Sequence, residues 1–351
     1  MNPTGHANDR DCSAFRLSVP CACRAERGVA LVVVLWVVLV LSLLIGGFAF
    51  TMHVETQLQS YHRKALKADA LARSGYELAR LALMQDAQGP DAEITAPNQA
   101  WVTNRNWFVD HELGEGKISV TITDEESKLP LNRLTPGQWR RLLDLLGVDP
   151  ADADVIADSV ADWIDDNDLH MLNGAEDEYY ASLVPPYRAK NAPLDRVEEL
   201  LLVRGVTPEL MYGVPADDEH EAIPGLAELL TTTTSGRINI NTASAIVLKA
   251  ALGLDDLQLE SILTRRPGPD GEWGTDDDQP FRNLNEFYAL LGNLTEEVRN
   301  QLSEWLAVRS THFTVRVTAE VAGVRRAVQA IVFVGDGGHT QVVCWREVPA
   351  S

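Results

Sequence analysis

Two clusters of carboxylates are the residues of this chain whose types and spacing could do chemistry. The first joins four aspartates to three acidic residues slightly further along: Asp162, Asp165, Asp166, Asp168, Glu176, Asp177 and Glu178. The second lies in the stretch 270–278, DGEWGTDDD, which has prolines on both sides. Carboxylates this close repel one another, and a hard cation such as Ca²⁺, which takes roughly six to eight oxygen ligands, relieves that repulsion. Both clusters therefore indicate calcium binding.

The stretch 270–278 has further features of a cation-binding loop. Gly271 and Gly274 would let backbone carbonyl groups turn toward an ion. The stretch lacks the regular ligand spacing of an EF-hand, so it is not one. An acidic loop that is simply solvated remains the alternative for both clusters. The candidate calcium ligands are Asp270, Glu272, Asp276, Asp277, Asp278, Asp166, Asp168, Glu176 and Asp177.

Catalytic chemistry has no comparable support. The histidines are scattered, and none lies near a Gly-x-Ser-x-Gly or similar nucleophile motif. The acidic pairs are too crowded with like charge for one carboxylate to be assigned general acid–base work. We therefore expect no catalytic residues and no enzyme activity. A hydrolase carried on a membrane stalk is an alternative that a complete nucleophile–base pair in the folded chain would support.

The charge balance of the chain excludes some partners. Asp and Glu number 51 against 30 Lys and Arg, for a formal net charge of −21 at pH 7. Nucleic-acid binding needs a basic face to meet phosphate, so nucleic acid is not expected as a partner. The same balance disfavours docking on anionic headgroups and suits a body held away from the membrane.

An uncharged apolar run dominates the N-terminal part. It begins directly after Arg27-Gly28 and extends from Val29 to Met52, long enough to cross a ~30 Å hydrocarbon core as a helix. No small-residue cleavage site follows the run, unlike in a secretory signal peptide. This layout is typical of type IV prepilin-like proteins, in which a cut between Gly28 and Val29 would leave the helix on the mature chain. An ordinary single-span anchor is the alternative.

The segments around this run predict the topology. Residues 1–28 are predicted to be a prepilin leader and residues 29–52 the transmembrane part of the N-terminal helix. Arginines precede the span, and positive charge beside a span predicts a cytoplasmic N-terminus. We therefore expect a single-pass protein of the bacterial inner membrane with the bulk of the chain periplasmic. Of the four cysteines, only Cys344 follows the cut, so no intrachain disulfide is expected after processing.

Periodic patterns beyond the span predict a helix and a sheet. Small and apolar residues recur every three or four positions from Leu58 to Ala82, which predicts that the helix continues to about Met84 and packs on a sheet or a neighbouring helix. Two β-rich runs around Gly114-Glu115-Gly116 predict a hairpin over 107–123. Alternating apolar residues predict three more strands, over 313–321, 327–333 and 341–345.

The pattern between these β segments is helical. Helices are predicted over 139–146, 154–165, 195–203, 243–252 and 285–291. This divides the body into a helix-plus-sheet core, residues 53–126 and 307–351, and an inserted helical domain, residues 127–306. Strands on either side of the insertion can still pair, because the entropy of loop closure grows only logarithmically with length.

Several short motifs occur in a characteristic order from Arg27 onward. They are Arg27–Leu31 with Leu35-Trp36, Asp124–Asn132, Asp162–Asp168, Gly174–Tyr180, Pro186–Leu194, Glu198–Leu200, Val203–Pro208 and Ile240–Ala243. Together they resemble the K-type minor pseudopilins of the type II (general) secretion pathway. The set in this order is far more specific than any single motif.

The resemblance implies a pilin-like α+β fold, in which a long N-terminal helix packs on a small antiparallel sheet. The inserted all-α domain would contain SAM-like or helix-hairpin-helix-like modules and bind calcium. The implied function is that of a non-enzymatic minor pseudopilin at the tip of a periplasmic pseudopilus, which initiates or caps it and supports export of folded proteins. The implied partners are minor pseudopilins of the I, J and H types, the inner membrane, and prepilin peptidase, which would cut after Gly28 and N-methylate Val29.

Val33, the fifth residue after the expected cut, fits this resemblance. Most pilin-like subunits carry Glu there, and a carboxylate within the membrane costs ~2.5–3.5 kcal/mol on insertion scales. In their assemblies this Glu pairs with the N-terminal ammonium of the subunit above. A subunit with nothing above it needs no such Glu, so its replacement is expected of the K type. A lipid-facing valine without special meaning is the alternative.

A membrane-anchored DNA-uptake protein is the alternative function. The segment 239–287 resembles helix-hairpin-helix modules of some DNA-binding proteins. However, Asp255 and Asp256 follow Gly253 in the hairpin and put two carboxylates where phosphate would sit. This favours a role in protein packing or protein binding.

Overall fold

The computed structural model describes residues 26–103, 108–216, 222–275, 277–292 and 294–350, with side chains from Val29 onward. Most of the predicted leader and the calcium candidate Asp276 therefore lie outside the described residues. The described residues fall into two compact units, which divide between His62 and Arg63.

The described part of the first unit is the apolar first half of helix α1 (Glu26–Asp86). Every residue from Val29 to Met52 is exposed, and the helix is long and apolar enough to cross a membrane. Apolar residues on all sides of a helix can leave water only in lipid or against other helices. This segment therefore meets the physical requirements of the predicted span.

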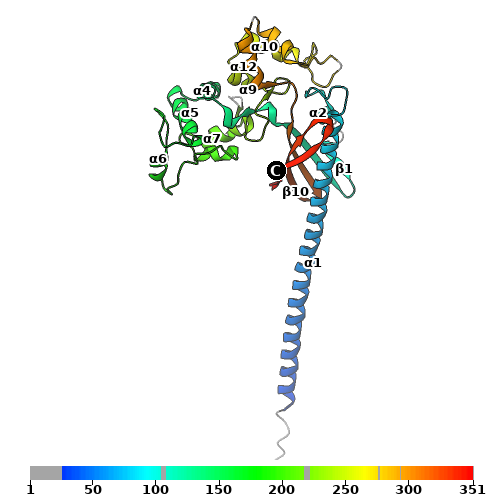
Figure 1. The fold of residues 1–351 in the computed structure, drawn as a ribbon. Coiled ribbons are helices and arrows are strands. Elements are labelled where there is room, and N and C mark those ends of the chain that lie inside the picture. The colour runs from blue at the N-terminus through cyan, green and yellow to red at the C-terminus, as the bar shows by residue number, and fades with distance from the viewer. Residues whose placement is uncertain (1–25, 104–107, 217–221, 276, 293, 351) are drawn as a thin grey trace, which may run out of the picture. The chain divides into compact units, whose positions relative to one another are not determined.

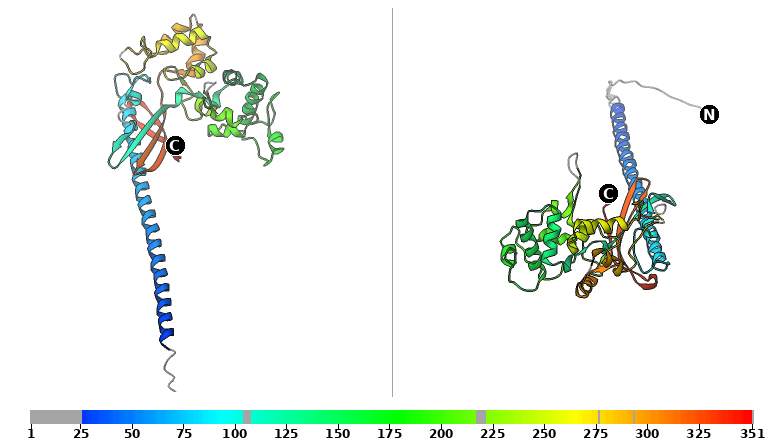
Figure 2. Two further views of the ribbon diagram at one scale, coloured as in Figure 1. Left: turned by 180° about the vertical axis from the view of Figure 1, so that it is seen from behind. Right: turned by 90° about the horizontal axis from the view of Figure 1, so that it is seen from above.

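The second half of α1 belongs to the second unit and lies along the sheet (Figure 1). Ala72, Ala79 and Ala82 on its inner face have no exposed surface. A Cβ built on Gly75 would lie 2.6 Å from Val317 Cγ1, so the absent side chain permits this close approach. The left view of Figure 2 shows the second half of α1 beside the sheet from behind.

The predicted stripe of small residues is confirmed over most of its length. Burial starts at Ala65, which is 4% exposed, whereas Leu58 and Tyr61 at the start of the stripe are exposed. The helix ends at Asp86, close to the predicted end at about Met84. Asp86 accepts hydrogen bonds from the amides of the short helix α2 (Ala100–Thr103) and so fixes the chain that follows.

Five of the described strands form an antiparallel sheet in the order β1-β2-β9-β10-β11. Their bounds are β1 His111–Leu113, β2 Gly116–Asp124, β9 His312–Val321, β10 Val324–Val334 and β11 Thr340–Val348. β2 pairs with β9 from Lys117–Glu320 to Asp124–Phe313. The chain thus leaves the sheet at Asp124 and returns on the neighbouring strand at His312, as the predicted insertion requires.

The three C-terminal strands are confirmed, but the first strand of the predicted hairpin is shorter than expected. β1 begins at His111 because Asp110 has a φ of 47°, which is incompatible with an extended strand. Phe108 precedes this turn and is buried in the core between α1 and the sheet. Trp107, where the hairpin was expected to start, lies outside the described residues.

Helices fill most of the segment between β2 and β9. Their bounds are α4 Pro136–Leu145, α5 Pro150–Ile164, α6 Asp177–Ala181, α7 Pro208–Tyr212, α8 Leu226–Leu229, α9 Ala245–Leu252, α10 Asp256–Arg265, α11 Leu284–Leu291 and α12 Glu296–Trp305. They enclose a second core around Trp139, Leu142, Ile156, Tyr180 and Phe287. Side-chain caps set the starts of most of them: Thr135 and Gln138, for example, form a capping box on α4.

The predicted helix over 195–203 is instead a 3₁₀-helix, η3 (Val197–Leu202). The Glu199 carboxylate accepts the amides of Asp195 and Arg196 and holds a tight first turn. Gly205, with a φ of 88°, stands just beyond the end of the element. Short connecting segments of this kind commonly adopt i→i+3 bonding.

Short elements complete the inserted segment. They are η1 Glu125–Ser127, β3 Leu129–Pro130, η2 Leu131–Arg133, β4 Gly213–Val214, β5 Ile223–Pro224, β6 Leu230–Thr231, β7 Ile238–Asn239 and β8 Leu306–Ala307. Outside the inserted segment, η4 (Asp336–Gly338) lies between β10 and β11. The parallel pairs β3–β6 and β7–β8 join segments far apart in sequence. The predicted α+β class, a long N-terminal helix on a small antiparallel sheet, is confirmed, whereas the modules of the inserted domain remain a prediction.

Candidate functional site

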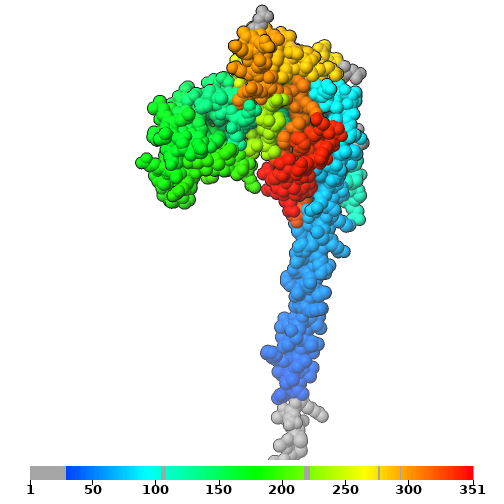
Figure 3. All heavy atoms as spheres, in the orientation of Figure 1, coloured from blue at the N-terminus to red at the C-terminus, as the bar shows by residue number. Residues whose placement is uncertain are grey.

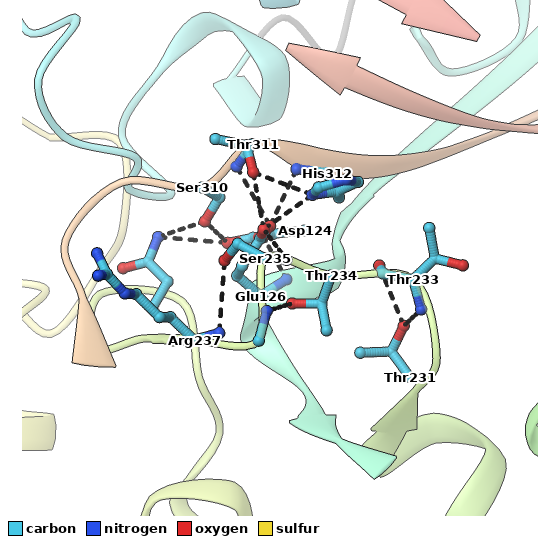
Figure 4. Close-up of polar contacts among 12 residues, drawn as sticks. Asp124, Glu126, Thr231, Thr233, Thr234, Ser235, Arg237, Ser310, Thr311 and His312 are labelled. Carbon is cyan, nitrogen blue, oxygen red and sulfur yellow. Dashed lines mark hydrogen bonds and ion pairs between the residues drawn. The ribbon is translucent and has the colours of Figure 1, made fainter. Parts of the chain in front are cut away.

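A buried cluster of polar residues lies where the inserted segment leaves and rejoins the sheet (Figure 4). We call Asp124, Glu126, Asn239, Thr242, Ser310, Thr311 and His312 the junction cluster. Asp124 ends β2 and is 2% exposed. Its carboxylate accepts bonds from Ser310 Oγ at 2.6 Å, Thr242 Oγ1 at 2.5 Å and Asn239 Nδ2 at 3.3 Å. One carboxylate thus connects β2 to segments before α9 and before β9.

Glu126, two residues later, is fully buried and binds the returning chain. Oε2 accepts the amides of Thr311 at 3.3 Å and His312 at 3.0 Å. Oε1 accepts the Ser235 amide and the Thr311 hydroxyl and contacts His312 Nδ1, at 3.1, 3.0 and 3.1 Å. Every contact joins the chain leaving the sheet to a segment more than a hundred residues later.

The pKa of Asp124 is raised from its ordinary value, whereas that of Glu126 is lowered. Burial, followed by the charge of Glu126, raises the pKa of Asp124 to about 7. Burial also acts to raise the pKa of Glu126, but hydrogen bonds from the side chain and backbone of His312 outweigh it and lower that pKa. Glu126 is therefore the member of the pair that is held as an anion.

Glu125 extends the junction on the side of β9. It is 5% exposed and accepts Thr314 Oγ1 at 2.6 Å and Lys128 Nζ at 3.0 Å. Sequence reasoning identified Asp124–Asn132 as a motif but assigned it no role. The sequence feature that could have indicated this role is the acidic run 124–126, directly at the end of a strand with alternating apolar residues. The geometry supports a structural role, fixing the inserted domain on the sheet.

The first acidic cluster surrounds Glu176, at the N-terminus of α6. Glu176 is 6% exposed, and both carboxylate oxygens are buried without a hydrogen-bond partner among the described residues. Burial, then the charges of Asp162, Asp165, Asp168 and Asp177, raise the pKa of Glu176 to about 7. An unpaired buried carboxylate beside other carboxylates is the arrangement that a bound cation would relieve.

The other members of this cluster have different surroundings. Asp162, at the end of α5, accepts the Met171 amide at 3.0 Å, and a Cβ on Gly174 would overlap its carboxylate. Asp177 accepts the Ala189 amide, and Asp168 accepts Asn191 Nδ2. The charges of Asp168 and Asp177 both act on Glu176, and their role as calcium ligands stays a prediction. Asp166 is exposed.

The second cluster lies in the loop that the Gln279 amide closes on the Arg266 carbonyl at 3.0 Å. Asp277 accepts the Asp270 amide at 3.2 Å, and Asp278 accepts the Gly274 amide at 2.8 Å. Its carboxylates therefore bind backbone of the same loop.

The remaining carboxylate oxygens of this loop range from buried to exposed. The Thr275 hydroxyl is the main cause of a lowered pKa at Asp277. Asp278 Oδ1 is buried without a partner among the described residues. Glu272 is exposed, and its amide donates to Asp270.

The two acidic clusters fit a cation to different degrees. Within the described residues, no three His, Cys, Asp or Glu side chains are already gathered closely enough to hold a metal ion. The orphaned oxygens of Glu176 and Asp278 are the observations that favour a cation. The Glu176 cluster has the stronger case, because the neighbouring charges act on that same carboxylate.

The residues of the expected processing site lie at the start of α1. Gly28 and Val29 fall within its first turn, and the Val29 side chain is 64% exposed. Val33 is 54% exposed on the surface of the same apolar segment. Its side chain is therefore available to lipid or to a neighbouring helix.

The hairpin between α9 and α10 has the carboxylates that sequence analysis placed there. Asp255 caps α10 by accepting the Gln258 amide at 2.8 Å. Asp256 pairs with Lys249 Nζ at 2.6 Å. Since carboxylates already occupy this helix N-terminus, a phosphate would meet like charge there.

Comparison with known proteins is consistent with this arrangement. Two family profiles match, both described as type II secretion system (T2SS), protein K: one over residues 120–214 and one over residues 238–309. Between them they contain most of the inserted segment and the end of β2 with Asp124 and Glu126. Ser310, Thr311 and His312 lie just beyond the second profile.

Relatives with the same description extend over most of the chain. Type II secretion system protein K of Pseudomonas aeruginosa is 28% identical over 289 residues, covering 78% of this chain and 82% of that protein. The protein of the same name from Aeromonas hydrophila is 27% identical over 338 residues, covering 88% and 93%. That from Klebsiella pneumoniae is 29% identical over 250 residues, covering 67% and 72%.

The fold also has a match among solved structures. A chain in the crystal structure of the GspK-GspI-GspJ complex from the enterotoxigenic Escherichia coli type 2 secretion system superposes with a TM-score of 0.64. The two chains are 21% identical, and the match covers 82% of this chain and 98% of that one. With the long apolar helix, the pilin-like sheet and the inserted helices, the chain belongs to the protein K family of type II secretion systems, the K-type minor pseudopilins.

Proposed function

We propose that this protein is a non-enzymatic subunit at the tip of a periplasmic pseudopilus, where it initiates or caps the assembly and supports export of folded proteins. The observation that carries the proposal is α1. Its first part, Val29–Met52, is apolar and exposed on every side, whereas the part from Ala65 lies on a sheet. Such a helix can be held in a bilayer and then packed against similar helices.

Processing would prepare α1 for this role. Prepilin peptidase cuts the bond between Gly28 and Val29 and methylates the new amine of Val29. The leader side is cytoplasmic, because the basic residues lie there. The second unit, residues 63–351, is then periplasmic.

Val33 supports placement at the tip. A subunit inside the assembly benefits from a Glu at this position that neutralises the amine of the subunit above it. Valine leaves that amine unpaired but avoids a membrane carboxylate, which costs ~2.5–3.5 kcal/mol on insertion scales. The inserted helical domain is also too bulky to be covered by further subunits.

The partners would be the minor pseudopilins of the I, J and H types. The matching crystal structure is that of a GspK-GspI-GspJ complex, which supports the first two directly. The H type is proposed from the resemblance alone.

The test is to follow the N-terminus and secretion together. The full chain is expressed in cells with the peptidase and the partner subunits, and intact-mass analysis should find a chain that starts at N-methylated Val29. Gly28→Asp should abolish processing and secretion. Gly137→Ala, at a position in α4 with no atom within 4 Å of the new Cβ, is the control outside the apolar segment and should change neither. Normal secretion by an uncleaved Gly28→Asp protein would contradict the proposal.

We further propose that the inserted domain binds calcium at the Glu176 cluster, with the 270–278 loop as a second candidate. Glu176 would be the central ligand, with Asp162, Asp165, Asp168 and Asp177 near it. The ion would supply positive charge that lets these carboxylates stay ionised together. In the second loop, Asp278 has the orphaned oxygen.

Calcium titration of the full chain in detergent tests this second proposal. Calcium should raise the melting temperature, a chelator should reverse the effect, and Glu176→Gln should remove most of it. Glu178→Gln, an exposed neighbour in the same helix, should retain it. A melt that does not change between calcium and chelator would contradict calcium binding.

A further inference from the structure

The two edges of the sheet differ in how well they are protected. β1 has three residues, His111–Leu113, and forms one edge. β11 forms the other edge with nine residues, Thr340–Val348, and has only β10 beside it among the described strands. Short, charged edge strands are a usual defence against unwanted pairing, and a long one leaves main-chain N–H and C=O groups unpaired. β11 is therefore the edge able to accept another strand.

Three large apolar side chains of β11 are exposed. Val342, Val343 and Trp345 are 43%, 50% and 37% exposed, and every residue from Gln341 to Glu347 is exposed. In the space-filling view the C-terminal residues lie on the surface facing the reader (Figure 3). A long apolar edge is an aggregation hazard unless a partner covers it.

A groove between α1 and β11 lies beside this edge. Arg73, Ser74, Tyr76, Glu77 and Trp345 line it. The Tyr76 and Trp345 rings meet edge to face with centroids 5.1 Å apart. This contact fixes Trp345 in place, so the groove is ready before any partner arrives.

The charges at this edge are unlike those of the rest of the chain. Although the chain has a formal net charge of −21, Arg73 and Arg346 have no ion-pair partner among the described residues. The Arg73 guanidinium lies 5.9 Å from the centre of the Trp345 ring. Glu347 is the one carboxylate on the strand itself. Two unpaired cations favour a partner that brings carboxylates.

We propose that β11 is the docking edge for an extended segment of a neighbouring pilin-like subunit, which pairs with the β11 backbone and places carboxylates near Arg73 and Arg346. This inference rests on the proposed function, because that function supplies the neighbouring subunits. Main-chain hydrogen bonds provide the affinity, and the exposed side chains select the segment. The I- and J-type subunits are the partners to test.

The register of β11 indicates where pairing is best. Its ladder with β10 is regular from Ala327–Val348 to Ile331–Cys344 and then shifts, so that Val343 is an extra residue. Such a bulge interrupts an edge and increases its twist. The incoming segment should therefore pair along Cys344–Val348.

Site-specific photo-crosslinking in cells tests the proposal. Benzoylphenylalanine is placed at Val343 on β11, at Glu112 on the opposite edge and at exposed Leu66 on α1, in the full chain with I- and J-type subunits present. We expect crosslinks to one of these subunits from Val343 and Leu66 but not from Glu112. If the probe at Leu66 crosslinks to a partner subunit but the probe at Val343 does not, the docking edge is overturned and the proposed function stays intact.

Other outcomes of the same experiment are equally decisive. The absence of crosslinks from both Val343 and Leu66 would count against the proposed function itself. A Val343 crosslink found only to a second copy of this chain would overturn the choice of partner.

A charge reversal tests the carboxylates of the partner. Arg73→Glu with Arg346→Glu should lower the amount of co-purified partner at least about tenfold, since like charges then face each other. Arg237→Glu, at an exposed arginine in the inserted segment, should leave it unchanged. An unaltered yield from the folded double variant, judged by its melting temperature, would rule out carboxylate recognition at this edge.

Discussion

Replacing Glu126 by glutamine tests whether the junction cluster holds the inserted domain on the sheet. Glutamine has nearly the same shape, so no cavity forms. Its one carbonyl oxygen can replace Oε2 and keep the amides of Thr311 and His312. The amide group then takes the place of Oε1 and faces the Ser235 amide, which is also a donor.

The size of the effect follows from these contacts. The Thr311 hydroxyl can rotate to accept a bond, but the Ser235 amide cannot and is left without its acceptor. A buried unsatisfied donor costs about 1–3 kcal/mol, and the bonds that remain lose their charge assistance. Part of this is offset because a neutral amide is cheaper to bury than a carboxylate. We expect a net loss of about 2 kcal/mol in the stability of the junction.

Hydrogen exchange is the appropriate assay, since a chain with several parts need not unfold in one step. A loss of about 2 kcal/mol should speed exchange at the Ser235, Thr311 and His312 amides by roughly 30-fold. Glu320→Gln is the control, because Glu320 pairs with Arg325 on the exposed side of the sheet, where such a change stays within about 0.5 kcal/mol. Equal protection in Glu126→Gln and wild type would refute the reasoning.

The pH dependence adds a second criterion. The pKa of Glu126 is lowered in the folded chain, so its stabilising contribution is fully present above the ordinary value of 4.5 and is lost as pH falls through the folded value. The difference between wild type and Glu126→Gln should therefore shrink below about pH 4. A difference that grows in acid would contradict the assignment of Glu126 as the anion.

Two further predictions concern α1 and the calcium site. Gly75→Ala should destabilise the packing of α1 on the sheet by about 1–3 kcal/mol in thermal or urea unfolding, because its Cβ meets Val317 at 2.6 Å. Gly137→Ala, with no atom within 4 Å, should be neutral or slightly stabilising. Without calcium, the stability contributed by Glu176 is fully present below its ordinary pKa of 4.5 and is lost as pH rises through about 7. With a chelator present, the melting temperature should therefore fall more between pH 5 and 8 for wild type than for Glu176→Gln. An equal dependence of the two melting temperatures on pH would contradict the raised pKa.

The patterns that predicted the elements are local. The apolar run 29–52, the small residues of α1 from Ala65, and the alternation of β9 and β10 can each be recognised within a single segment. Periodicity reports which face of an element is buried, so element type and the α+β class followed from it. Element ends were less accurate: a single left-handed residue, Asp110, shortened β1.

The candidate sites depend on longer-range information. The acidic clusters were visible as runs of carboxylates, but the sequence does not show which carboxylate is buried. Only the fold makes Glu176 the buried, unpaired one and leaves Asp166 exposed. The junction cluster was missed because its members come from residues 124–126, 239–242 and 310–312.

By itself, the sequence determined the membrane-length apolar helix, the alternating strands, the helical insertion and the motifs of the protein K family. Each of these depends on residue types at fixed short spacings, which every chain with this order of residues carries into its fold. The tertiary structure decided that Glu126 closes the insertion and that β11 rather than β1 is the open edge. Burial and strand order depend on which distant segments meet, and no local spacing specifies that.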